Sequence, residues 1–375
     1  MIGRAAVHPP RAASGCPPYR REVTTTAPAR RDRQRELAEP PASGHGPRSW
    51  LYALTTNPPP AAGSDIDGVT RWVVVTRAAV LPMTLFAGLV AGLLAVRARG
   101  FSWLDLVLAV VGIVLAHLNN NLTNDLFDTS SGNDTEGYPR TLYAPHPLLS
   151  GLVTTRQLYG AVSVTVLGDL AIAAVLLDRR GWGVVAFATA GIVLSVAYTA
   201  PPLRLKARGL GEPDVLVVWG PLMVGGTYYA ATGSLPWQVI VASIPYGLLC
   251  TTVLMGKHVD KIPYDGPAGT RTLPVLLGER RARLLTLGLM AGFYVTVVVG
   301  VLLGALPWPT LVVVLALPRL VQVWKAFLAP PPDEPPKHFP VWPLWYAAVA
   351  FVHVRRAGAL LVLGLLVAAV ADIHR

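Results

Sequence analysis

The sequence has little charge. Only 14% of its 375 residues are Asp, Glu, Lys or Arg, whereas 53% are hydrophobic. A soluble globular domain carries roughly a quarter charged residues, so this composition indicates a chain that crosses a membrane several times. The formal net charge of +11 is consequently no sign of nucleic-acid binding by itself, and we expect no nucleic-acid partner.

Cysteine is scarce as well. Cys16 lies in a polar segment and Cys250 in an apolar one. Neither has a second cysteine nearby or the spacing of a thiolate metal site. A disulfide framework and a cysteine-ligated metal are therefore excluded as organising features.

Long apolar runs are missing from the first part of the chain. Residues 1–70 are rich in Arg, Pro, Ala and Gly and contain no hydrophobic stretch of spanning length. This composition is typical of disorder. We expect residues 1–70 to form a disordered, basic, cytoplasmic tail and residues 71–375 to form the membrane domain.

From residue 72 onward, apolar segments long enough to cross a bilayer follow one another. We expect an all-α polytopic membrane protein with about nine transmembrane helices, arranged as two four-helix halves around a central cavity. The predicted spans are 72–96, 103–124, 158–177, 184–198, 215–231, 239–255, 284–306, 311–327 and 357–371, with 342–356 as a half-buried approach to the last one.

The basic residues are distributed unevenly between the two sets of loops. Most stand in the loops after the second, fourth, sixth and eighth spans, as Lys206, Lys261 and Arg271 do, and few stand in the opposite loops. Positive charge marks the cytoplasmic side. We expect an integral protein of the cell (inner) membrane, with its N-terminus in the cytoplasm and its C-terminus outside.

Carboxylates and amides cluster at the cytoplasmic end of the second predicted span. On a helix, Asn121 would share a face with Asp125, and Asn124 with Asp128, because each pair is four residues apart. Acids at membrane depth persist mainly where they pair, line a cavity or hold a cation. Oxygen ligands of this kind suit Mg²⁺, which binds a few carboxylates together with substrate phosphate. The residues predict a membrane enzyme that handles a diphosphate.

A second acidic segment ends the sixth predicted span. Asp260 and Asp265 are five apart, and Pro263 between them disfavours an unbroken helix, so Asp265 is expected in the following loop. Two solvated loop acids beside Lys261 are the alternative. The position of this segment at the same membrane face as the first cluster favours a joint site.

These motifs carry a resemblance. The pattern Asn-x-x-Asn-Asp-x-x-Asp-x-x-x-Gly-x-Asp at 121–134 resembles the first motif of the UbiA superfamily of intramembrane prenyltransferases. More narrowly, it is similar to the branch that contains 1,4-dihydroxy-2-naphthoate polyprenyltransferase. The segments 198–212 and 260–278 resemble the following loop and the second acidic motif of that family.

The resemblance implies a helical bundle with a cavity open toward the membrane lipid, in which two Mg²⁺ ions hold an allylic isoprenyl diphosphate. The diphosphate ionises, and a small aromatic acceptor from the cytoplasm attacks the resulting cation. The implied catalytic acids are Asp125, Asp128, Asp260 and Asp265. The implied ligands of the first ion are Asn121, Asp125, Asp128 and Asp134, and those of the second ion are Asp260 and Asp265. The implied substrate-binding residues are Asn121, Asn124, Arg77, Arg140, Lys206, Arg271 and Tyr198.

The sequence departs from the family pattern around the second acidic motif. Its two acids stand further apart than usual, and Gly256-Lys257-His258 replaces the asparagines of the naphthoate branch. Lys257 and His258 are equally compatible with a site role and an interfacial one. These departures leave the acceptor open: it is plausibly dihydroxynaphthoate, and the alternatives are a phosphoribosyl or glycerophosphate lipid precursor, or the prenyl chain itself in a cyclase. A transporter or a non-catalytic scaffold explains the two acidic motifs less well.

Overall fold

The computed structural model describes residues 44–56, 65–130, 145–337, 339 and 341–372, except for the side chains of Asp128 and Ser130. All of these residues belong to one compact unit, Leu37–Arg375. Asp134 and Arg140 lie outside the described residues.

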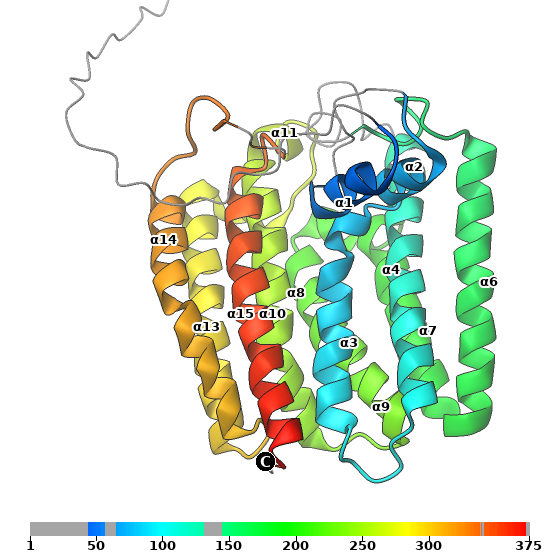
Figure 1. Cartoon of the computed structure of the whole chain (residues 1–375). Helices are drawn as coiled ribbons and strands as arrows, with labels where there is room; N and C mark the ends of the chain where they lie inside the picture. The colour runs from blue at the N-terminus through cyan, green and yellow to red at the C-terminus, as the bar shows by residue number, and fades with distance from the viewer. Residues whose placement is uncertain (1–43, 57–64, 131–144, 338, 340, 373–375) are drawn as a thin grey trace, which may run out of the picture. The chain divides into compact units, whose positions relative to one another are not determined.

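Nine segments of the described chain are long and apolar enough to cross a membrane (Figure 1). They are η1 with α3 (Ala78–Val80, Leu81–Ala95), α4 (Trp103–Ser130), α6 (Thr155–Arg180), α7 (Trp182–Thr199), α8 with η3 and α9 (Gly211–Val217, Val218–Gly225, Gly226–Thr232), α10 (Trp237–Asp260), α13 (Glu279–Leu302), η4 with α14 (Trp308–Ala316, Leu317–Leu328) and α15 (Trp345–Val370). The predicted all-α membrane fold is confirmed.

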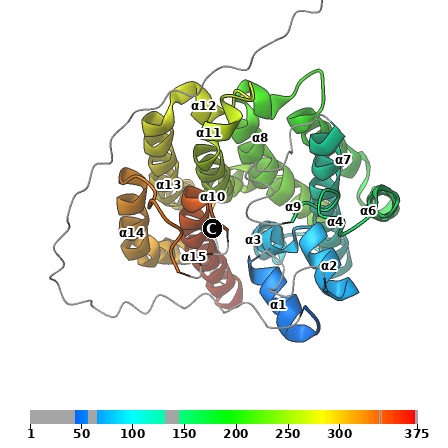
Figure 2. The ribbon, with the colours of Figure 1, turned by 90° about the horizontal axis from the view of Figure 1, so that it is seen from above.

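Helix α10 lies at the centre of the bundle and packs against α13, α15, α8 and η3. Seen from above (Figure 2), α4, α6 and α7 lie on one side of α10, and α13, α14 and α15 lie on the other. Glycine allows close approaches of this kind: a Cβ added at Gly247 would lie only 2.7 Å from the backbone oxygen of Leu216.

The first predicted span is not one continuous helix. Helix α2 (Gly68–Val75) ends before Arg77, which has a left-handed backbone with φ 54°, and η1 begins after it. A non-glycine residue rarely adopts this conformation, and it interrupts the helix at the point where the chain enters the bundle. The break places the guanidinium group of Arg77 against α4.

A helix also forms within the predicted tail, so the expectation of disorder up to residue 70 is wrong for α1 (Pro47–Thr56). The carboxylate of Asp67 joins α1 to α2: it accepts hydrogen bonds from the Trp50 indole at 2.8 Å and from the backbone N–H of Thr70 at 2.7 Å. Burial alone would raise the pKa of Asp67, but these bonds and one from the Gly46 backbone outweigh it and hold the pKa well below its usual range.

The last span begins earlier than predicted. Helix α15 starts at Trp345, so the expected half-buried approach at 342–356 largely belongs to the span. Arg355 and Arg356 stay exposed on the surface of this helix and do not end it.

Helices α1, α2 and the short α11 (Ile262–Asp265) lie at one end of the bundle, and the C-terminus of the chain lies at the other (Figure 1). Because α10 ends directly before α11, the second acidic segment lies at the same end as Arg77 and the carboxyl end of α4.

Candidate active site

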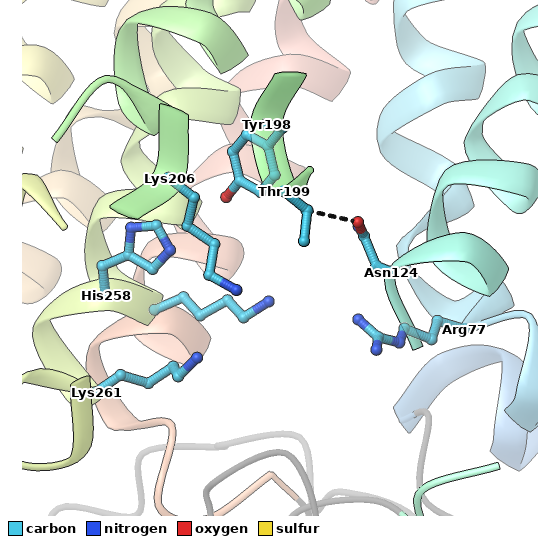
Figure 3. A pocket seen from close by; sticks show the side chains of 8 residues that line it. Arg77, Asn124, Tyr198, Thr199, Lys206, His258 and Lys261 are labelled. Atoms are coloured by element: carbon cyan, nitrogen blue, oxygen red, sulfur yellow. Dashed lines mark hydrogen bonds between the residues drawn. The ribbon is translucent and has the colours of Figure 1, made fainter. Parts of the chain in front are cut away.

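A pocket opens between the ends of α4, α7 and α10 (Figure 3). Among the described residues that line it, four are basic and none is acidic. The lining residues are Arg77, Asn124, Tyr198, Thr199, Lys206, Lys257, His258 and Lys261. Figure 3 shows Lys206 and Lys261 on one side, with Asn124 and Arg77 on the other.

Arg77 forms an ion pair with Asp125 behind the pocket wall. The Asp125 side chain is fully buried, and the imidazole Nε2 of His146 lies 3.7 Å from the same carboxylate oxygen. Asn121, one turn before Asp125 on α4, donates its amide N–H to the backbone oxygen of Thr76 at 3.0 Å. The first acidic motif therefore also holds the break at Arg77 in place.

Asparagines on α4 position α7 beside the pocket. Asn120 accepts a hydrogen bond from Ser195 at 2.8 Å, and one turn later Asn124 accepts one from Thr199 at 2.9 Å. Since the side-chain oxygen of Asn124 is engaged by Thr199, its NH₂ group is the part that can serve an anion in the pocket. These two bonds hold α7 against α4 and so fix the position of Tyr198, the neighbour of Thr199, beside the pocket.

His258 forms a buried pair with Glu212. The Nδ1 atom of His258 lies 2.7 Å from an oxygen of Glu212, and each side chain is only 2% exposed. Glu212 is at the start of α8, so this contact ties α8 to α10. His258 is consequently held with its ring at the pocket wall.

The two acids of the second motif do not line the pocket. Asp260 accepts hydrogen bonds from the backbone N–H groups of Tyr346 and Ala347, each at 2.9 Å. Asp265 is buried, and Lys261 Nζ lies 3.6 Å from its carboxylate.

The structure thus brings together part of the predicted site. Arg77, Asn124, Tyr198 and Lys206 share the pocket, with Asn121 and Asp125 directly behind Arg77. Arg271 is exposed and is not a lining residue. Asp134, Arg140 and the side chain of Asp128 cannot be placed, because they lie outside the described residues.

Lys261 and Thr199 line the pocket although they were not among the predicted site residues. Lys257 and His258, for which a site role and an interfacial one were both open, line it too. A signal was present in the spacing: Lys257 and Lys261 are four residues apart at the end of α10, which puts both on one face of a helix.

This arrangement is suited to a polyanion. Lysine acts as a point charge for phosphate oxygens and arginine as a planar fork, and four such groups meet at the mouth of an apolar helical bundle. Among the described residues there is no group of three or more His, Cys, Asp or Glu side chains that could hold a metal. Two predicted ligands of the first motif, the side chain of Asp128 and Asp134, lie outside the described residues.

Fold and site together define an integral membrane protein with a cationic pocket at one end of its helices. Residues 84–349 match the UbiA prenyltransferase family. The chain belongs to this family and is a prenyltransferase.

Named relatives agree with this assignment. The chain is 30% identical to 1,4-dihydroxy-2-naphthoate octaprenyltransferase of Haemophilus influenzae, over 68% of this chain and 85% of that protein. It is 32% identical to digeranylgeranylglyceryl phosphate synthase of Natronomonas pharaonis, over 68% of this chain and 86% of that one. The fold is similar to that of a UbiA homologue from Aeropyrum pernix, with a TM-score of 0.51 and 19% identity over 77% of this chain and 96% of that one.

Proposed function

We propose that this chain transfers an isoprenyl group from an allylic prenyl diphosphate to a small aromatic acceptor, with 1,4-dihydroxy-2-naphthoate as the favoured acceptor. The observation that carries the proposal is the cationic pocket beside the buried Asp125 motif, in a chain similar to a naphthoate prenyltransferase over most of its length.

We propose that the reaction depends on Mg²⁺ and that the first acidic motif binds the ion. The donor set fits, because Asn121 and Asp125 are oxygen ligands on one face of α4, buried next to a residue that lines the pocket. Asp128 and Asp134 complete the predicted ligand set. When bound, the ion would neutralise the diphosphate and make it a better leaving group. The two-ion stoichiometry implied by the family resemblance requires Asp260 and Asp265 as well.

The side chains around the pocket would bind and orient the diphosphate. Arg77 is placed by its ion pair with Asp125 and can direct a remaining N–H toward a phosphate oxygen. Lys206 offers a positive charge from the opposite wall, and the NH₂ group of Asn124 a neutral donor. Arg140 and Arg271 stay as predicted contacts of the same substrate.

The prenyl chain would extend from this mouth toward the apolar bundle and the surrounding lipid. There the allylic carbon loses its bond to diphosphate, in surroundings that exclude water. The ring face of Tyr198 can stabilise the developing positive charge. Attack by the carboxyl-bearing carbon of dihydroxynaphthoate, followed by loss of CO₂, would give the prenylated product.

We propose that the pocket faces the cytoplasm of the cell. Its lining lysines lie in the last turn of α10 or in the connections where basic residues are concentrated, and positive charge marks that side of the membrane. A soluble aromatic acid made in the cytoplasm could then reach the pocket without crossing the bilayer.

A glycerophosphate lipid precursor is the second candidate acceptor. The relative from Natronomonas pharaonis supports it, since its name denotes an ether-lipid synthase. The same donor site would serve both reactions, because only the nucleophile changes. The four basic residues would then also attract the phosphate of the acceptor.

The acceptor can be identified directly. Purified protein in lipid nanodiscs is incubated with labelled geranylgeranyl diphosphate, Mg²⁺ and one acceptor at a time: dihydroxynaphthoate, 4-hydroxybenzoate or geranylgeranylglyceryl phosphate. We expect a labelled decarboxylated product with dihydroxynaphthoate only, as determined by mass spectrometry. A labelled ether lipid, with no naphthoate product, would establish the second candidate instead.

A further inference from the structure

The second acidic segment has contacts that differ from those of a metal site. We propose that Asp260 and Asp265 hold no second metal ion, and that Lys257 and Lys261 supply the positive charge on that side of the prenyl diphosphate. This inference deepens the proposed function and rests on it.

Asp260 is engaged by the N-terminus of α15. Each of its carboxylate oxygens accepts a hydrogen bond from a backbone N–H of the first turn of that helix, from Tyr346 and from Ala347, at 2.9 Å. The N-terminus of a helix carries partial positive charge. A divalent cation on the same carboxylate would lie against that charge and would have to share the carboxylate with two amide donors. Asp260 therefore fastens α15 to α10.

A close approach of the two helices supports this role. One turn before Asp260, a Cβ added at Gly256 would lie 2.6 Å from the backbone oxygen of Tyr346. The first turn of α15 thus rests directly on α10, and the carboxylate of Asp260 faces its amides because of that contact.

Asp265 already has a cation beside it. Lys261 Nζ lies 3.6 Å from its carboxylate, and the two side chains are 7% and 1% exposed, respectively. The ammonium already offsets the charge of this carboxylate. With Asp260 engaged by α15, no second acid of this segment is left to share an ion with Asp265. Asp265 instead holds Lys261 at the pocket wall, where Figure 3 shows its amino group.

The lysines can replace the charge of an ion. Lys257 and Lys261 lie one turn apart and line the same pocket as Lys206. Two ammonium groups carry the charge of one divalent cation and bind phosphate oxygens without a fixed coordination geometry. The bound prenyl diphosphate would then take one metal ion per chain, at the first motif.

Counting bound metal tests the inference. The purified full chain is mixed with Mn²⁺, which substitutes for Mg²⁺ and is detected by electron paramagnetic resonance, and with an unreactive prenyl thiolodiphosphate. We expect one Mn²⁺ per chain, and two per chain would overturn the inference while leaving the proposed function intact. If the analogue does not bind at all, the proposed function fails, and the inference fails with it.

Variants separate the roles of the acids and the lysines. Asp260→Asn should lower the thermal midpoint without changing the Mn²⁺ count, and loss of Mn²⁺ from a folded Asp260→Asn protein would contradict the inference. Lys261→Gln should weaken analogue binding by about tenfold, roughly the value of one charge-assisted hydrogen bond, and Lys261→Arg should restore most of it. Lys325→Gln, an exposed lysine of α14 outside the pocket, is the matched control and should leave binding unchanged.

Discussion

At the scale of single residues, the pair of Arg77 and Asp125 is predicted to affect both stability and substrate binding. Both side chains are buried or nearly so, and removing one partner of a buried pair leaves an uncompensated charge. Arg77→Ala should therefore lower the free energy of unfolding by about 3–5 kcal/mol and abolish prenyl transfer. Thermal unfolding in detergent and a turnover assay measure the two effects.

Two further variants serve as controls for Arg77→Ala. The double variant Arg77→Met with Asp125→Leu should regain much of the stability but none of the activity. Arg97→Ala removes an exposed ion pair with Asp372 and should cost only about 0–1 kcal/mol. An active double variant would show that Arg77 does not bind substrate.

The asparagines of α4 offer a second test at this scale. Asn120 and Asn124 make the same kind of hydrogen bond to α7, but only Asn124 lines the pocket. Each change to alanine should cost about 1 kcal/mol of stability. Only Asn124→Ala should raise the KM for prenyl diphosphate, and an equal rise with Asn120→Ala would argue against the assigned pocket.

Sequence reasoning at this scale found the acids and several of the bases but not all of their partners. The spacing of Asn121, Asn124 and Asp125 suffices to place them on one helix. It does not reveal that Asp260 turns toward the N-terminus of α15, because that contact joins residues 86 apart in the chain. Long-range contacts of this kind depend on packing, which local pattern does not encode.

At the scale of helices, the crossing of α10 and α15 fixes where the second acidic segment lies. Gly256→Ala would push a methyl group into the backbone of Tyr346. We expect a loss of about 1–3 kcal/mol, because rigid backbone has to move apart. The control is Gly288→Ala on α13, where an added Cβ meets nothing within 4 Å; it should be neutral or slightly stabilising. If Gly256→Ala and Gly288→Ala changed the thermal midpoint equally, the described crossing of α10 and α15 would be contradicted.

Hydropathy predicts the spans well, because every apolar segment of sufficient length became a helix. It fails where backbone conformation or capping decides the outcome. The break at Arg77 requires a left-handed residue that no hydropathy pattern reveals. Helix α1 depends on the hydrogen bond from Trp50 to Asp67, a contact across 17 residues.

At the scale of the whole molecule, the orientation in the membrane decides which substrates reach the pocket. In a chain with Cys16 and Cys250 replaced by Ser and Ala, a single cysteine is introduced at Ala268 or at Ser234. Both positions are exposed, and they lie beyond opposite ends of α10: Ser234 just before its first residue and Ala268 after its last. We expect a membrane-impermeant thiol reagent, added to intact cells, to label Ser234→Cys only. Labelling of Ala268→Cys alone would reverse the proposed orientation.

The central claim is that a prenyl diphosphate binds between the ends of α4, α7 and α10. A photoreactive prenyl diphosphate analogue with its reactive group near the diphosphate, cross-linked to the protein and mapped by mass spectrometry, tests this most directly. We predict labelled peptides that contain Asn124, Tyr198 or Lys257, with labelling suppressed by inorganic diphosphate and Mg²⁺. Labelling confined to α6, α13 or α14, or unaffected by diphosphate, would contradict the account.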